Sequence, residues 1–139
     1  MPIAKPPLAV IAEDEPVLAR TLQRLLAEIW PELQIAGVAE DGPKAIELAL
    51  EYLPDVMFLD IKMPGKTGLE VAEVVADDWP QEKAAPLFVF ITAYDEFAVP
   101  AFERAAVDYL LKPATLERLQ VTVERLKQVG GAERALREL

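Results

Sequence analysis

Short apolar runs alternate along the chain with longer segments in which apolar residues recur at every third or fourth position. Continuous apolar runs that end at polar or turn residues predict buried strands, whereas the wider spacing predicts helices with one buried face. The sequence accordingly predicts five strands, at residues 8–12, 34–39, 55–59, 87–91 and 108–111. The second run is less apolar than the others, which indicates a strand at the edge of a sheet.

A helix is predicted after each strand, and local signals mark where the helices begin and end. The predicted starts share a first-turn proline or a capping side chain, and they are Pro16, Asp41, Thr67 or Gly68, and Thr115. A fourth helix is predicted to follow residues 94–96 and to run through Pro100 to about Ala105. We expect a polar connection over 77–86, and we expect Gly130-Gly131 to end the last helix.

Five strands that alternate with five helices predict an α/β fold in which helices cover both faces of a parallel sheet. Right-handed crossovers leave few topologies for such a chain. We predict a flavodoxin-like (βα)5 doubly wound sheet with strand order 2-1-3-4-5. We expect an irregular N-terminus at 1–7, one domain over 8–128, and a linker or charged tail over 129–139.

Composition narrows the classes of function. The 139 residues are 53% hydrophobic, which suits one domain with a real core. The net charge of −10 makes direct nucleic-acid binding by this chain a poor hypothesis. There is no Cys and no His, so disulfides, thiolates and imidazole chemistry are excluded. No apolar run approaches the roughly 20 residues of a membrane span, and no signal peptide is visible, so we predict a cytoplasmic protein without a membrane partner.

Polar side chains follow the predicted strands at the point where each strand ends. Glu13 and Asp14 follow the first strand, and Asp60 follows the third. In a doubly wound sheet of this order the two strands are neighbours at the switch point, where ligands bind. Carboxylates that crowd together destabilise the fold unless a cation neutralises them, and Mg²⁺ prefers such oxygen ligands. The alternative is that one or more of these acids caps a helix or faces water.

Asp60 is the candidate nucleophile, because a carboxylate can form an acyl phosphate. Transfer of a phosphoryl group also needs donors that hold its oxygens. Thr92 at the end of the fourth strand offers a hydroxyl, and Lys112 at the end of the fifth offers an ammonium. Taken singly, Thr92 is more simply interpreted as a strand-end threonine with a local hydrogen bond, and Lys112 as a surface lysine. Pro113 forces the lysine out of helical geometry, which helps to aim it across the strand ends.

Four motifs, in order, resemble the receiver domain of two-component response regulators over about residues 8–128. They are Ile11-Ala12-Glu13-Asp14-Glu15-Pro16, Phe58-Leu59-Asp60-Ile61-Lys62-Met63-Pro64-Gly65, Phe90-Ile91-Thr92-Ala93 and Asp108-Tyr109-Leu110-Leu111-Lys112-Pro113. Each motif alone is modest, but all four at these separations are a strong signal. The resemblance implies a signalling switch rather than an enzyme.

The resemblance also implies roles for the acids. Asp60 would accept a phosphoryl group from a histidine kinase, which makes the kinase a partner. Glu13, Asp14 and Asp60 would hold Mg²⁺. The backbone carbonyl of Lys62 would complete the metal site.

The remaining motif residues would respond to phosphorylation. Thr92 and Lys112 would bind the phosphoryl oxygens, and the small Ala93 would leave room beside them. Thr92 and Tyr109 would form a switch pair, in which the hydroxyl moves toward the phosphate and the ring follows inward. The surface of the fourth helix, fifth strand and fifth helix would then change, and a homodimer is expected when the chain is phosphorylated.

Residues 14–20, 93–98, 101–103 and 106–113 further resemble receivers of the LytTR subgroup, which usually precede a DNA-binding LytTR domain. We expect DNA binding only through such a C-terminal domain, which is absent from this sequence. The chain is then either a fragment that ends in its linker or a receiver that works alone. Two other hypotheses remain. One is a Mg²⁺-dependent phosphatase, although Lys62 stands where a haloacid-dehalogenase-like enzyme has its second acid. The other is a pseudo-receiver that never carries phosphate.

Overall fold

The structure of the chain is a computed structural model that describes residues 5–93 and 106–138, with side chains as far as Gly130. A single sheet contains the strands β1 (Leu8–Ala12), β2 (Gln34–Ala39), β3 (Val56–Leu59), β4 (Leu87–Thr92) and β5 (Asp108–Leu111). Their order is β2-β1-β3-β4-β5, and every pair is parallel. The predicted flavodoxin-like order is therefore confirmed, with β2 at an edge as expected.

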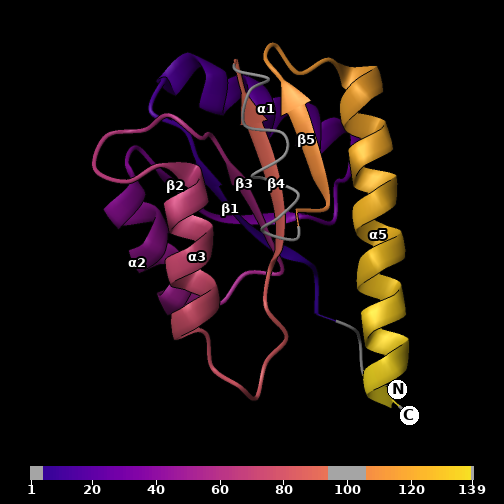
Figure 1. The fold of residues 1–139 in the computed structure, drawn as a ribbon. Coiled ribbons are helices and arrows are strands. Elements are labelled where there is room, and N and C mark those ends of the chain that lie inside the picture. Colours follow the sequence, from indigo (N-terminus) through magenta and orange to yellow (C-terminus); the bar gives the residue numbers. More distant parts are fainter. Residues whose placement is uncertain (1–4, 94–105, 139) are drawn as a thin grey trace.

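Helices cover both faces of the sheet (Figure 1). The helices α2 (Gly42–Tyr52) and α3 (Gly68–Asp78) pack on one face, and α1 (Pro16–Ile29) and α5 (Leu116–Glu138) pack on the other. The predicted fourth helix through Pro100 lies outside the described residues. Among the described helices, none combines the length and the apolar character that a membrane span requires.

The helix starts follow the predicted signals. Pro16 occupies the first position of α1, where its missing N–H leaves no bond unmade. Asp41 caps α2 by accepting the Lys44 backbone N–H at 2.8 Å. Thr67 and Glu70 exchange the two hydrogen bonds of a capping box at the start of α3.

Two predicted helix ends are wrong. The helix α5 continues through Gly130-Gly131 to Glu138, because glycine within a helix only reduces stability by about 1 kcal/mol relative to alanine and does not force an end. The helix α3 includes Asp77 and Asp78 and ends before Trp79-Pro80, so the connection to β4 is shorter than predicted. The domain end at 128 stays a prediction.

The strands divide the core into two apolar layers. Alternate strand residues such as Met57 and Leu59 face α2 and α3, while Val56 and Phe58 face α1 and α5. Because both faces are covered, β1 and β3 are apolar throughout and β4 is apolar as far as Ile91, as buried parallel strands are. The layers hold the strand ends in register, and this places the polar residues that follow each strand at one edge of the sheet.

Candidate functional site

The carboxyl ends of β1 and β3 bring two acids together. Ala12 and Leu59 are partners in the register of these strands, so the next residues, Glu13 and Asp60, leave the sheet side by side. The Asp60 backbone N–H donates to the Ala12 carbonyl at 2.9 Å, which extends the ladder to the site itself. The sheet therefore fixes the spacing of these two carboxylates.

Asp14 completes a cluster of three carboxylates. Glu13, Asp14 and Asp60 each offer an oxygen, and these oxygens all lie within 4.8 Å of one another. Glu13 and Asp60 are buried, at 7% exposure each, whereas Asp14 is exposed. Hard oxygen donors with an open side suit Mg²⁺, which keeps several waters. The donor set thus fits the predicted ion.

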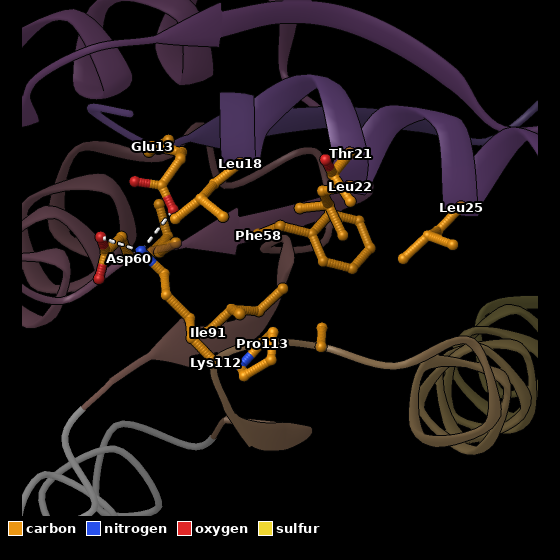
Figure 2. A pocket seen from close by; sticks show the side chains of 13 residues that line it. Glu13, Leu18, Thr21, Leu22, Leu25, Phe58, Asp60, Ile91, Lys112 and Pro113 are labelled. Carbon is orange, nitrogen blue, oxygen red and sulfur yellow. Dashed lines mark hydrogen bonds and ion pairs between the residues drawn. The ribbon is translucent and has the colours of Figure 1, made fainter. Parts of the chain in front are cut away.

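Lys112 lies between the two buried acids, as Figure 2 shows. Its Nζ is 2.5 Å from Glu13 Oε1 and 2.8 Å from Asp60 Oδ2. The Lys112 backbone N–H donates to the Thr92 carbonyl at 2.8 Å, which anchors the residue at the end of the β4–β5 ladder. The predicted approach of Lys112 to Asp60 is therefore observed, and its contact with Glu13 is an addition that the sequence did not reveal.

The two sides of this contact titrate differently. Burial raises the pKa of Glu13 to about 7, and the nearby Asp60 charge adds to the rise, while the hydrogen bond from Lys112 opposes it. Burial lowers the pKa of Lys112, but hydrogen bonds to Asp60 and Glu13 outweigh this and hold the pKa above its usual value. The ammonium is therefore charged at neutral pH, and two carboxylates share it.

Thr92 ends β4 with its side chain fully buried. Its Oγ1 has no hydrogen-bond partner within the part of the chain that the structure describes. A buried hydroxyl without a partner destabilises a protein by about 1–3 kcal/mol, so such a group calls for an explanation. A ligand oxygen that arrives at the strand ends would supply the missing partner.

Tyr109 and Lys62, which the resemblance assigns to the switch and to the metal site, lie on β5 and in the loop after β3. Tyr109 lies in β5 beside Phe90 of β4, and its half-buried ring packs against the core layer of α2 and α3. Lys62 is exposed, two residues after Asp60 in the loop to α3. The metal contact of its carbonyl stays a prediction, as does the switch role of Tyr109.

Gly68 has a structural role at the site that sequence reasoning missed. A Cβ at this position would lie 2.3 Å from the Asp60 carbonyl oxygen, and the Gly68 N–H donates to the Ile61 carbonyl at 2.8 Å. Only glycine permits this approach of α3 to the backbone of the acid. The sequence feature that could have revealed this role is a glycine at the first position of a helix whose N-cap, Thr67, already starts the helix.

A second charged cluster was also missed. The Asp108 carboxylate is 2% exposed and accepts hydrogen bonds from Arg118 at 2.7 and 2.9 Å and from Thr122 at 2.8 Å. Arg125 lies 3.0 Å from the same carboxylate. The signal was an acid on a buried strand followed by polar residues at 118, 122 and 125, which lie on one face of a helix. The cluster fixes α5 against β5 and so helps to place Lys112 between them.

The family model for the response regulator receiver domain matches residues 9–124. An uncharacterized response regulatory protein of Vibrio cholerae is 51% identical over 120 residues, which cover 86% of this chain and 44% of that protein. The transcriptional regulatory protein BtsR of Salmonella typhi is 42% identical over 119 residues, covering 86% of this chain and 47% of that protein. The sensory transduction protein LytT of Oceanobacillus iheyensis is 38% identical with the same coverage, which confirms the predicted likeness to LytTR-type regulators.

The fold comparison agrees. The response regulatory domain of mrkE from Klebsiella pneumoniae superimposes with a TM-score of 0.78 at 32% identity, covering 88% of this chain and 96% of that one. The chain spans about half the length of the curated relatives that it matches. With this family match over most of its length, the chain belongs to the receiver domain family of two-component response regulators.

Proposed function

We propose that the chain is a phosphoacceptor switch in which Asp60 receives a phosphoryl group from a histidine kinase. One observation carries the proposal: the buried Asp60 carboxylate lies within 4.8 Å of the Glu13 and Asp14 carboxylates and 2.8 Å from the Lys112 ammonium. Asp60, Glu13 and Lys112 also line a cavity that is open to solvent, so a donor can reach the acid. Membership of the receiver family supports the same role.

The transfer is an exchange of one bond for another. An Asp60 carboxylate oxygen attacks the phosphorus of a phosphohistidine, an O–P bond forms, and the N–P bond breaks. The electron pair of that bond returns to the imidazole nitrogen, which takes a proton from solvent. Lys112 stabilises the charge on the phosphoryl oxygens, and the Thr92 hydroxyl gains a hydrogen-bond acceptor.

The proposal includes a Mg²⁺ site made by Glu13, Asp14 and Asp60, with the Lys62 carbonyl as a further ligand. When bound, the ion would neutralise the negative charge that develops on the phosphoryl oxygens. Lys112 contacts two of these carboxylates, Glu13 and Asp60, and supplies one positive charge against three negative ones. We infer that this excess of negative charge favours the binding of a divalent cation.

Phosphorylation would add up to about two negative charges beside Thr92 and Lys112. We infer that Thr92 turns toward the phosphate and that the Tyr109 ring moves further into the layer against which it packs. The phosphate can shift this equilibrium only by its differential affinity for the two states. The proposed outputs are homodimerisation and control of a C-terminal DNA-binding domain, as the transcriptional regulators among the relatives suggest.

A phosphatase is the less favoured alternative. Exposed Lys62 occupies the position two residues after Asp60, where that class needs a general acid. We expect negligible multiple turnover on simple phosphate esters. A measured turnover would favour the enzyme over the switch.

The proposal is tested by intact mass after incubation with Mg²⁺ and a small phosphodonor. Wild type should gain the mass of one phosphoryl group, and Asp60→Asn should not. Asp78→Asn, a change at an exposed acid at the end of α3, should gain it as wild type does. An unmodified wild type, or an equal adduct in Asp60→Asn, would overturn the proposal and favour a pseudo-receiver.

A further inference from the structure

The cavity that Glu13, Asp60 and Lys112 line extends away from these groups as an apolar pocket, and this apolar part has no role in the proposed phosphoryl transfer. The whole cavity measures about 60 Å³ and lies between α1, the sheet and the loop from β5 to α5. Figure 2 shows Glu13 and Asp60 at one end of this cavity and Leu25 at the far end. The side chains between these ends are mainly hydrocarbon, and they include Leu18, Leu22, Phe58, Ile91 and Pro113.

The α1 wall of the cavity is incompletely buried. Leu18, Leu22 and Leu25 are half-buried, whereas Leu26 on the same helix is 1% exposed within the core. Hydrocarbon that fills the cavity would remove this leucine surface from water, which is favourable in proportion to the apolar area covered. The cavity therefore favours an apolar occupant over water.

The polar end of the cavity is anionic. Glu13 and Asp60 line this end and carry two negative charges when ionised, and Lys112 supplies one positive charge. Asp14 lies outside the lining but belongs to the same carboxylate cluster, and with it the net charge is −2. Each carboxylate has about four acceptor positions, so the bonds to Lys112 do not saturate it. An ammonium group can therefore join Lys112 at this end, while a carboxylate would be repelled.

The size of the cavity limits the apolar part of the occupant. One water-sized position takes about 10–15 Å³ on this measure, so the cavity holds about four to six heavy atoms. Thr21 lines the wall, but its hydroxyl donates to the Val17 carbonyl at 2.9 Å and so offers no free hydrogen to a ligand. The polar contacts of a ligand are thus concentrated at the carboxylate end.

We propose that this cavity binds a small amphiphilic cation, a primary ammonium group on an unbranched chain of about four to six carbons. The ammonium group lies against Glu13 and Asp60. The chain lies under α1 along Leu18, Leu22 and Pro113. Occupancy holds the loop that contains Lys112 against α1, and it places a fixed cation beside the acids.

The direct test is titration of the chelator-treated protein with pentylammonium, followed by backbone amide shifts in NMR. Shifts should concentrate in α1 and in the residues after β5. Each added carbon from propyl to pentyl should tighten binding about fourfold. Pentanol and pentanoate should bind at least about tenfold more weakly than pentylammonium, because neither has a cation. Equal binding of pentanol, or shifts scattered over the surface, would overturn the proposal.

Variants separate the cavity from the charge cluster. Leu22→Phe fills the cavity from α1 and should weaken pentylammonium at least about tenfold without changing the binding of ethylammonium, which is too short to use it. Ala114→Leu fills it from the loop and serves if the first variant does not fold. Val17→Ala, at an exposed α1 residue outside the cavity, is the matched control and should bind as wild type does. Undiminished binding in both filled variants would exclude this cavity.

No phosphodonor takes part in these titrations, so their outcome is independent of the phosphoacceptor proposal. A protein that binds pentylammonium but gains no phosphoryl mass would retain the cavity proposal and lose the proposed function. A protein that is phosphorylated at Asp60 but binds pentanol and pentylammonium equally would support the phosphoacceptor function and overturn the cavity proposal.

Discussion

Replacing Lys112 with methionine should tighten the binding of Mg²⁺, even though Lys112 belongs to the proposed active site. The ammonium lies 2.5 Å from Glu13 and 2.8 Å from Asp60, and all three side chains are at most 15% exposed. A divalent cation at these acids must compete with this ammonium. Methionine retains the length of the side chain and removes the competitor, so the net charge of the ionised site changes from −2 to −3.

The magnitude follows from the contacts. A hydrogen bond to a charged group contributes about 1.5–3 kcal/mol, and Mg²⁺ must displace at least the bond between Lys112 and Glu13. Loss of that competition should lower the Kd for Mg²⁺ by a factor of about ten or more, since 1.4 kcal/mol is tenfold. Isothermal titration with MgCl₂ well above pH 7, where Glu13 is ionised, measures the Kd directly.

The metal-free Lys112→Met protein should be less stable than wild type, although it binds Mg²⁺ more tightly. Without metal, Lys112→Met leaves two buried carboxylates without their cation, and breaking a buried pair reduces stability by about 3–5 kcal/mol. Saturating Mg²⁺ should restore much of that loss in thermal unfolding. Lys127→Met, at a lysine that contacts the Trp30 ring, is the control. It should change neither the Kd for Mg²⁺ nor the increase in melting temperature that Mg²⁺ produces. A folded Lys112→Met protein with unchanged or weaker Mg²⁺ affinity would refute the competition.

Three further predictions concern the support of the site. Asp108→Asn should reduce the free energy of unfolding by about 2–3 kcal/mol, through loss of charged hydrogen bonds from Arg118. Burial raises the pKa of Asp108, but those bonds and the one from Thr122 outweigh this and hold the pKa below its usual value of 3.8. The stability that the Asp108 carboxylate contributes is therefore complete above pH 3.8 and is lost as the pH falls through the lower pKa of the folded state. Urea unfolding at several pH values, in wild type and in Asp108→Asn, measures this loss. Phe58→Ala, at a residue 1% exposed, should reduce stability by about 3–5 kcal/mol in the same assay. Gly68→Ala should reduce stability by about 1–3 kcal/mol and slow the phosphorylation of Asp60, because the new methyl group displaces the Asp60 carbonyl. Intact mass followed over time measures the rate of phosphorylation, and a rate equal to that of wild type would contradict the close contact.

The strands could be predicted from sequence because parallel strands buried on both faces are apolar without interruption. Helix starts were equally accessible, since Asp41 and Thr67 bond to backbone groups only three residues away. The end of α5 was not, because its earlier turns bury Leu119, Val123 and Leu126 in the core and the weak preference of Gly130 against a helix is not enough to end it. Local signals therefore predicted starts better than ends.

At the site, the sequence predicted which strand ends meet, but not which side chains bond. Lys112 reaches both Glu13 and Asp60, and this choice depends on the geometry of β4 and β5 rather than on any local motif. The contact between Gly68 and the Asp60 carbonyl was equally hidden, because it joins a loop to a helix start in three dimensions. Pairings between distant residues become visible only after the sheet has set their separation.

The site also has a consequence for the stability of the whole domain. Glu13 and Asp60 are buried around one ammonium, and Thr92 is buried without a hydrogen-bond partner among the described residues. Each of these groups makes the ligand-free fold less stable than an apolar substitute would. A ligand that binds only the folded state recovers stability as RT ln(1 + [L]/Kd), which is about 2.7 kcal/mol at a hundredfold excess over Kd. Occupation of the acidic site and stability of the sheet ends are thus one linked equilibrium, and a cation that binds there must raise the melting temperature.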